Sequence, residues 1–384
     1  MKLLHQLGHN HKWALDAFFE NNIGDGFILS AFSIEKEKIG QILSGYSPDK
    51  YLPVSFLDLQ FYAGKDSLGG KLDTYGFHPI NHKTEDTEVS TLDAVMAGVK
   101  FQEKLGFKNI LIPNIYIDPE NPDRTGRLIK EINKRISKER KENILYFMTI
   151  PIIGSVIDND SDVEKLLQEL TDMDICFDGY YVVCESNLEF KKKISTDYKY
   201  YINLSKILTT LKKQDFKTML GFSNIDALVF STMADIDYIT IGTYENLRKF
   251  SIKRFTEESN GGASEGWYYS GKILNFIKAR QIEIFRGKGL LNLIKNQDNV
   301  FSDVILTEGY QWNTHRPDVH KNYLVEISRQ LKELNSREVS NRSKYFIEIV
   351  EKSRGLYHDL ESKGVYLDDE SSNYHLATWL SVIK

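Results

Sequence analysis

The sequence predicts a (β/α)₈ barrel of the TIM type, an α/β fold, with a C-terminal helical extension. Short apolar runs and amphipathic segments alternate along most of the chain, which is typical of parallel strands joined by right-handed crossovers. The apolar runs are nearly continuous, as expected for strands that are buried on both faces. Because the units follow one another without a domain break, a closed barrel is favoured over an open doubly wound sheet.

The elements are expected in a regular order. The predicted strands are residues 26–32, 52–62, 108–116, 144–152, 179–185, 218–222 and 238–242. The predicted helices are residues 13–19, 35–43, 91–105, 127–141, 162–170, 204–213, 226–230 and 244–248. Gly106 is placed to end the helix of residues 91–105. Residues 267–270 would supply the eighth strand and residues 272–285 its helix, whereas the first twelve residues are expected to form a mobile or capping segment.

The last part of the chain reads as helical. Amphipathic segments are found at residues 323–334, 344–356 and 374–383. The expected organisation is therefore a barrel over residues 1–270, followed by the last barrel helix and a helical extension over residues 271–384.

Composition excludes several classes of protein. The net charge of -5 and the pI near 6.0 give no overall attraction to nucleic acid or anionic membranes. Cys176 and Cys184 are too few for a disulfide framework and fit a reducing compartment. No run approaches the ~20 apolar residues that span a bilayer. A cytoplasmic protein without a membrane partner is expected.

Candidate catalytic residues follow from the rule that barrel enzymes carry them at the carboxyl ends of strands. The rule selects Asp58 and Gln60 from the second predicted strand, residues 52–62, Asn114 from the third, residues 108–116, and Glu185 at the end of residues 179–185. An acid inside an apolar run is costly unless it is hydrogen-bonded or used. Asp58 is the first choice for a functional carboxylate and Glu185 the second. The alternative is a buried network that joins Asp58 to Ser30 or Thr149.

A candidate phosphate site lies where two neighbouring strands end near glycine and lead into helices. Unpaired N–H groups in the first turn of a helix favour an anion. The residues expected to hold it are Gly221, Ser223, Asn224, Gly242, Thr243 and Arg248. The alternative is that a tight turn alone requires these glycines.

Other patterns have a structural and a functional interpretation. The basic segment 124–141 has the spacing of a solvated outer helix, with a nucleic-acid or partner surface as the alternative. His5, His9 and His11 have no Cys or carboxylate nearby, so no metal site is expected. His78 and His82 lie in the long loop after residues 52–62, where one of them would suit acid–base chemistry.

Several motifs are absent from the sequence. It contains no GxxxxGK[ST], GxGxxG, HExxH, GxSxG or CxxC pattern. P-loop nucleotidases, Rossmann dehydrogenases, zincins, α/β-hydrolases and zinc ribbons are therefore poorly supported.

One short stretch resembles a known family. The sequence IGTYENL at residues 241–247 is similar to the VGTPEDL strand-to-helix turn of the tRNA-guanine transglycosylase barrels. The resemblance implies a (β/α)₈ barrel with helical additions that exchanges a base at an N-glycosidic bond. The zinc cluster of that family needs three Cys and a His, which this chain lacks, and its DSGGFQ loop has no counterpart at residues 30–33. The resemblance therefore implies a divergent, zinc-free branch, and it transfers no nucleophile.

The favoured function is a barrel enzyme that acts on a phosphate-bearing substrate, a nucleotide or a nucleoside within nucleic acid. Carboxylates suit a glycosidic bond because they stabilise an oxocarbenium-like transition state. Transferase or hydrolase chemistry is expected, and a flavin enzyme is a further alternative for the cofactor. From another class, the chain would be an inactive scaffold that binds a protein partner through residues 124–141 or the C-terminal helices.

Overall fold

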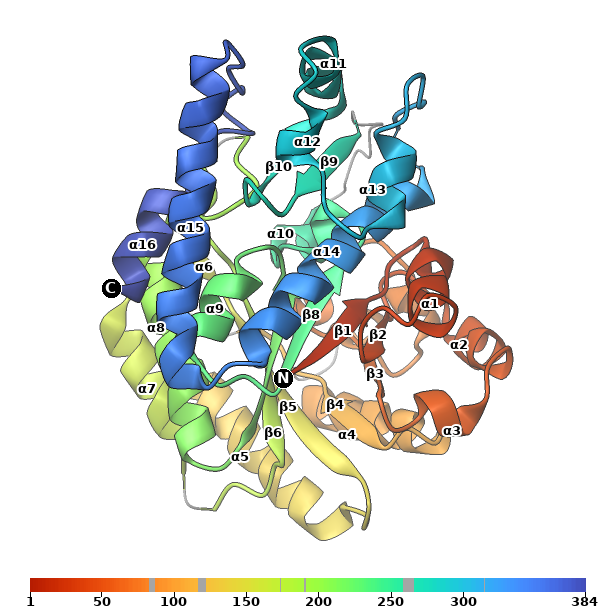
Figure 1. The fold of residues 1–384 in the computed structure, drawn as a ribbon. Helices are drawn as coiled ribbons and strands as arrows, with labels where there is room; N and C mark the ends of the chain where they lie inside the picture. The colour runs from red at the N-terminus through yellow and green to blue at the C-terminus, as the bar shows by residue number, and fades with distance from the viewer. Residues whose placement is uncertain (83–86, 117–121, 173, 190, 258–265, 314) are drawn as a thin grey trace.

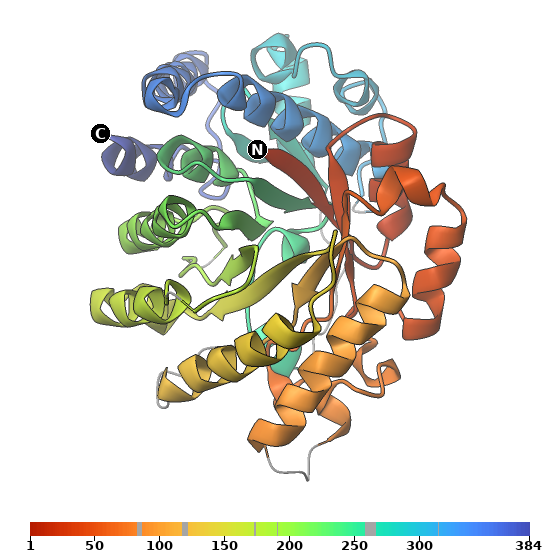
Figure 2. The same ribbon diagram turned by 90° about the horizontal axis from the view of Figure 1, so that it is seen from below.

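The chain forms a nearly closed barrel of eight parallel strands, which confirms the predicted fold class (Figures 1 and 2). The computed structural model describes residues 1–82, 87–116, 122–172, 174–189, 191–257, 266–313 and 315–384. The strands are β1 (Lys2–Gln6), β2 (Gly26–Ser30), β3 (Ser55–Asp58), β4 (Asn109–Ile112), β5 (Leu145–Ile152), β6 (Gly179–Cys184), β7 (Lys217–Ser223) and β8 (Tyr238–Gly242).

β3 and β4 are the two edge strands of the sheet, and they lie next to each other without forming a hydrogen-bonded strand pair. Every other neighbouring pair is joined by strand hydrogen bonds, in the order β3-β2-β1-β8-β7-β6-β5-β4. At one end of the remaining gap the Asn109 side chain donates to the Pro53 carbonyl at 3.0 Å. At the other end the Tyr116 N–H donates to the Tyr62 carbonyl at 2.8 Å. These two bonds hold β3 and β4 side by side.

Helices form the outer ring, which Figure 2 shows around the strands. They are α1 (His11–Phe19), α2 (Lys36–Ser44), α3 (Pro48–Tyr51), α4 (Thr87–Lys104), α5 (Pro122–Glu139), α6 (Gly154–Ile157), α7 (Asp160–Leu170), α8 (Tyr198–Lys213) and α9 (Ala227–Met233). The position after β8 is taken by α14 (Pro317–Asn335), which packs between α9 and α1. Gly106 ends α4 as predicted, with a φ of 86° that favours glycine.

The prediction of the first and eighth strands was wrong. Strand β1 pairs with β2 on one side and with β8 on the other, so the first residues of the chain complete the barrel. Residues 267–270 form β9 (Trp267–Ser270), which pairs antiparallel with β10 (Asn275–Lys278) outside the barrel. The sequence of β1 is short and half polar, and its His5 and Gln6 are fully buried. A five-residue strand in which three residues are polar carries no apolar run by which it would be recognised.

Two helix predictions also differ from the structure. Residues 244–248 were expected to form a helix, but only one 3₁₀ turn, η4 (Glu245–Leu247), is present. The helix expected at residues 272–285 begins at Ala279 instead, as α11 (Ala279–Gly287), because the residues before it pair with β9.

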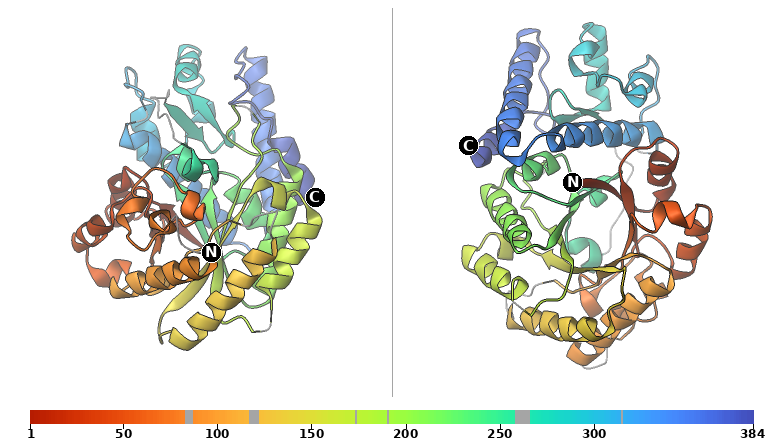
Figure 3. Two further views of the ribbon diagram at one scale, coloured as in Figure 1. Left: turned by 180° about the vertical axis from the view of Figure 1, so that it is seen from behind. Right: turned by 60° about the horizontal axis from the view of Figure 1, so that its bottom comes forward.

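A long insertion separates β8 from α14. It contains η4, α10 (Lys253–Thr256), the β9–β10 hairpin, α11, α12 (Leu291–Ile294) and α13 (Val300–Ile305). Figures 1 and 3 show the hairpin and α11 over one end of the barrel. This is the end at which β8 finishes, so the insertion covers the carboxyl ends of the strands. The loop after β3 adds three 3₁₀ turns, η1 (Gly64–Asp66), η2 (Leu72–Thr74) and η3 (Pro79–Asn81).

The last two helices lie outside the barrel wall. They are α15 (Val339–Ser362), which packs on α9, and α16 (Leu376–Ile383), which packs on α8 and α9. Among the residues that the structure describes, no helix is long and apolar enough to cross a membrane.

The barrel interior changes from apolar to polar along its axis. Near the amino ends of the strands, the rings of Phe56, Phe147 and Tyr238 contact one another edge to face, with centroids 5.6–5.8 Å apart. Further along, the Tyr181 hydroxyl lies 3.3 Å from Gln6 Oε1 and 3.4 Å from Asp58 Oδ2. The polar layer is thus placed at the carboxyl ends, where barrel enzymes carry their active sites.

Candidate active site

Asp58 is the carboxylate at the centre of the polar layer. It is the last residue of β3 and is 2% exposed. It accepts hydrogen bonds from the Tyr62 hydroxyl at 2.6 Å, the Gln60 N–H at 3.0 Å and the Tyr181 hydroxyl at 3.4 Å. Burial raises the pKa of Asp58 to about 7, although these hydrogen bonds and the charge of Arg254 act in the opposite direction. A carboxyl group that exchanges its proton near neutral pH suits general acid–base work.

The Gln60 side chain bonds to the end of β2 and to the loop that follows it rather than to Asp58. Its backbone is left-handed, with a φ of 54°, and its Oε1 accepts from the Ser30 hydroxyl at 2.7 Å and from the Phe32 N–H at 2.8 Å. Ser30 and Thr149, the alternative partners of Asp58, make no hydrogen bond to it within the described chain. Asp58 is therefore held by tyrosines rather than by these hydroxyls.

Buried donors without partners surround the polar layer. Within the described residues, the side-chain atoms Gln6 Nε2, Gln60 Nε2, Asn114 Nδ2, Thr149 Oγ1, Ser223 Oγ and Arg254 Nε are buried and make no hydrogen bond. Most buried polar groups in proteins are paired, so each of these atoms needs an explanation. They come from strands and loops at one end of the barrel, where ligand or water oxygens would satisfy them.

The mouth of the barrel is closed over Asp58 by the α10 segment, defined here as residues 250–257. The rings of Phe250 and Phe255 lie 5.0 Å from the Tyr62 ring, centroid to centroid. The Phe255 carbonyl accepts from the Leu68 N–H at 2.5 Å, which ties the segment to the loop after β3. Within the described chain, the α10 segment therefore packs over the tyrosine that donates to Asp58.

Glu185 holds this segment in place. Its Oε1 accepts from the Ile252 N–H at 2.6 Å and its Oε2 from the Gly154 N–H at 3.2 Å. Neither Asp58 nor Glu185 lines any of the four cavities described for the chain. Both oxygens of Glu185 are used by the backbone, and its catalytic role stays a prediction.

The β7 half of the predicted phosphate site is occupied by the chain itself. A Cβ on Gly221 would lie 2.5 Å from Tyr181 Cε2, so this glycine makes room for the ring that reaches Asp58. The Asn224 N–H donates to Asp226 Oδ1 at 2.9 Å, and its side chain donates to the Lys193 carbonyl at 2.9 Å. A carboxylate of the protein thus takes the position expected for an anion.

The β8 half of that site opens onto a cavity. Gly242 lies against Leu247, where a Cβ would collide, and the Thr243 carbonyl accepts from the His320 ring at 2.7 Å. A cavity of about 90 Å³, called here the β8 cavity, is lined by Lys193, Thr243, Tyr244, Glu245, Arg248, Gly266, Trp267, Phe276, Val319, His320 and Tyr323. The structure therefore brings Thr243 and Arg248 together in the cavity lining, whereas Gly221, Ser223, Asn224 and Gly242 are not part of it.

Two cations and several aromatic rings line the β8 cavity. The Arg248 guanidinium lies 4.7 Å from the Phe276 centroid and 4.6 Å from the Tyr323 centroid. Lys193 is 4.1 Å from the Trp267 centroid and pairs with Glu245 at 2.5 Å. Within the described chain Arg248 makes no ion pair, and its buried Nε has no partner. The Arg248 guanidinium thus interacts with the Tyr323 hydroxyl and with the charge of Glu245 rather than with a paired acid of the described chain.

Sequence reasoning missed several residues of the site. Gln6, Tyr62, Tyr181 and Arg254 surround Asp58, and Lys193 comes from the loop before α8. The tyrosine within the apolar run of β6 was the one available signal, because a buried tyrosine usually finds a hydrogen-bond partner. His78 is buried with its Nδ1 bonded to the Ile80 N–H, and burial lowers its pKa to about 4.

Comparisons with known proteins add little. No protein-family model and no curated protein matches the sequence. Among solved structures, an apo form of a Gas2p mutant from Saccharomyces cerevisiae shows 11% identity and a TM-score of 0.32. The alignment covers 63% of this chain and 53% of that one, so the chain spans about half the length of that structure. A similarity this distant carries no information about function. In the described residues, no three His, Cys, Asp or Glu side chains are grouped as a metal site requires.

Proposed function

We propose that this protein is a barrel enzyme that acts on a phosphate-bearing substrate of the nucleotide type and uses Asp58 as its acid–base group. The observation that carries the proposal is a buried carboxyl with a pKa of about 7, next to buried donors that have no partners. Perturbed carboxyls and unpaired donors concentrate at active sites, because both are costly to the fold unless a ligand uses them.

The substrate's phosphate is assigned to the β8 cavity. Arg248 supplies a guanidinium without an ion-pair partner in the described chain, and Lys193 adds a second, partly neutralised charge. Phosphate groups prefer such cations, and the loop after the eighth barrel strand is a common place for them.

The proposed reaction is transfer or hydrolysis at an N-glycosidic bond. A carboxyl group with a pKa near 7 can protonate a departing base and then stabilise positive charge on the sugar when it is ionised. Gln60 and Asn114 each keep an unpaired amide N–H that would position the substrate. The α10 segment would exclude water once the substrate is bound.

A binding and turnover experiment tests this proposal. Purified protein is first scanned for co-purified flavin or nucleotide by absorbance and native mass spectrometry, and then mixed with a nucleotide panel. We expect a thermal shift with nucleotides that is lost in Arg248→Gln and kept in Lys253→Gln, a neighbouring exposed cation outside the cavity lining. Base release, followed by chromatography, should disappear in Asp58→Asn.

The scaffold alternative is supported by one observation. Asp58 is almost fully buried and Glu185 is bonded through both oxygens, so the barrel is closed as it stands. If no nucleotide binds, and Asp58→Asn changes only stability, the enzyme proposal is wrong and the scaffold is favoured. The basic helix α5 is a weak docking surface, because several of its cations pair with acids of the neighbouring helices, Arg135 with Asp93 among them.

A further inference from the structure

A second cavity lies on the opposite side of the barrel from the β8 cavity, beside β3 and β4. It has a volume of about 80 Å³ and is called here the α4–α5 cavity. Its lining comes from the loop after β3, the first turns of α4 and α5, and the residues that follow β4: Ala63, Gly64, Lys65, Asp66, Pro79, His82, Ser90, Thr91, Ile115, Tyr116, Arg124 and Thr125. Since a bound water needs roughly 10–15 Å³, this space can hold a group larger than one water.

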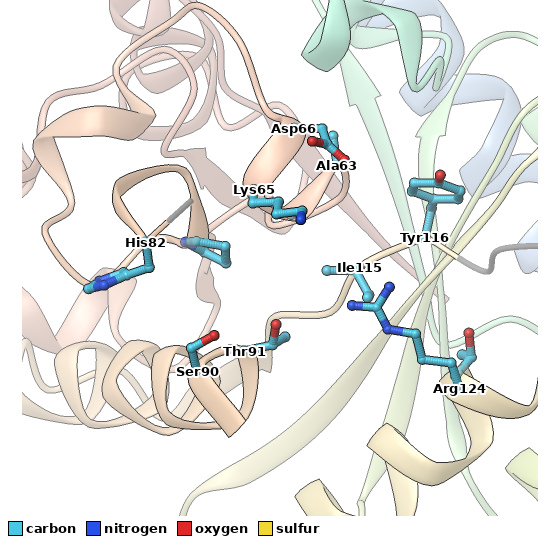
Figure 4. Close-up of a pocket in the computed structure, with 12 residues that line it drawn as sticks. Ala63, Lys65, Asp66, His82, Ser90, Thr91, Ile115, Tyr116 and Arg124 are labelled. Atoms are coloured by element: carbon cyan, nitrogen blue, oxygen red, sulfur yellow. The ribbon is translucent and has the colours of Figure 1, made fainter. Parts of the chain in front are cut away.

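Two cations reach into this space without ion-pair partners. Figure 4 shows Lys65 and Arg124 extending toward the same volume from two different elements, with the Thr91 hydroxyl below them. Neither cation makes an ion pair or a side-chain hydrogen bond within the described chain, which distinguishes them from Lys130 and Arg135 further along α5. The His82 ring, which also lines the cavity, is bonded to the Gly76 carbonyl at 3.0 Å.

Two long helices begin at the cavity. α4 starts at Thr87 and α5 at Pro122, so Ser90, Thr91, Arg124 and Thr125 all lie in or next to a first turn. First-turn N–H groups lack partners within the helix, and the helix dipole favours negative charge there.

Thr125 adds a hydroxyl to the same lining. It is 4% exposed, and it follows Arg124 in the first turn of α5. The oxygen of a bound anion would accept from this hydroxyl.

We propose that the α4–α5 cavity binds the phosphate group of a small molecule, held by Lys65, Arg124 and the Thr125 hydroxyl. Among the described residues of the lining, one acid, Asp66, lies beside two cations, and this balance of charge is compatible with an anion. Arg presents a planar fork of donors and Lys a point charge, and the combination fits the several oxygens of a phosphate. This inference does not rest on the proposed function of the β8 cavity.

The test uses inorganic phosphate as the probe. Binding to the full chain is measured by isothermal titration calorimetry at constant ionic strength, with chloride as the reference anion. We expect affinity to fall about tenfold or more in Arg124→Gln, because a hydrogen bond to a charged group is lost. Lys65→Gln and Thr125→Val should weaken binding as well. Lys138→Gln removes an exposed cation from the same helix outside the lining and should leave the affinity unchanged.

Each outcome decides between the two cavities. Loss of binding in Arg124→Gln but not in Arg248→Gln supports the α4–α5 site. Loss in Arg248→Gln alone would place the phosphate in the β8 cavity and overturn this inference while leaving the proposed function standing. Wild-type protein that binds no phosphate at millimolar concentration would overturn it too. Because Lys65 is exposed, Lys65→Gln remains informative even if Arg124→Gln fails to fold.

Discussion

Burial and hydrogen bonding act in opposite directions on the Asp58 carboxyl. Removal from water raises its pKa, and the donors Tyr62, Gln60 and Tyr181 lower it, with a result of about 7 against an ordinary 3.8. The folded protein therefore holds a proton on Asp58 at pH values where the unfolded chain has released it. Asp58 therefore adds to the free energy of unfolding below about pH 4, and this contribution is lost as the pH rises to about 7.

The first prediction concerns this pH dependence. Replacing Asp58 with Asn removes the titration, so the free energy of unfolding of the variant should fall less than that of the wild type between pH 4 and pH 7. Each unit of pKa shift corresponds to about 1.4 kcal/mol, so a difference of a few kcal/mol is expected across this range. Urea unfolding at several pH values measures it. Asp49→Asn, at an exposed carboxyl, is the control, and parallel profiles for wild type and Asp58→Asn would contradict the assignment.

A second prediction at this scale concerns Gly221. A Cβ there would lie 2.5 Å from both Tyr181 Cε2 and Val183 Cγ1, so Gly221→Ala should overpack the barrel and displace the Tyr181 hydroxyl from Asp58. The expected loss of unfolding free energy is about 1–3 kcal/mol. Gly40→Ala is the matched control, since Gly40 lies within α2 with nothing within 4 Å of its added Cβ. That variant should gain up to about 1 kcal/mol. Equal effects of the two changes would show that Gly221 is not a packing requirement.

At the scale of elements, the α10 segment is held by backbone groups rather than by regular structure. Its Ile252 N–H bonds to Glu185, and its Phe255 carbonyl bonds to the Leu68 N–H. α10 itself has only four residues, so it has little stability of its own. Its position over Asp58 depends on these contacts and on the packing of its rings.

The third prediction follows from this dependence. In Glu185→Ala the Ile252 N–H loses its acceptor, so amide hydrogen exchange across residues 250–257 should become faster while β6 stays protected. Exchange mass spectrometry measures both regions. Glu189→Ala removes an exposed acid from the same loop and should leave the exchange of the α10 segment unchanged. Unchanged exchange in Glu185→Ala would mean that ring packing and the hydrogen bond between Phe255 and Leu68 hold the segment without Glu185.

The strands that have continuous apolar runs were predicted from the sequence, whereas β1, which has no such run, was not. The ends of β5 and β8 were predicted to within one residue, because strands that are buried on both faces have nearly continuous apolar sequences. β1 was missed because three of its five residues, including the buried His5 and Gln6, are polar. Asp58 and Gln60 were found by their place at a strand end, whereas Tyr181 and Arg254 approach them from distant parts of the chain. Such pairings depend on the tertiary fold and have no local signature.

At the scale of the whole molecule, the C-terminal helices share a core with the barrel wall. Trp379 of α16 is fully buried, and its indole N–H donates to the Tyr201 hydroxyl of α8 at 2.9 Å. Its ring also lies 5.8 Å from that of Phe346 in α15. One side chain therefore connects both C-terminal helices to the helix that follows β6.

The fourth prediction uses this residue to ask whether the extension unfolds separately. Trp379→Ala should lower the free energy of unfolding by about 3–5 kcal/mol, because it leaves a cavity between α8, α15 and α16. Trp379→Phe keeps most of the ring and loses the hydrogen bond, so a loss nearer 1 kcal/mol is expected. Circular dichroism and intrinsic tyrosine fluorescence should follow one coincident transition that moves as a whole. If the barrel kept its transition while only the helical signal of the extension moved, the extension would be an independent unit, and the shared core would contribute little to the stability of the barrel.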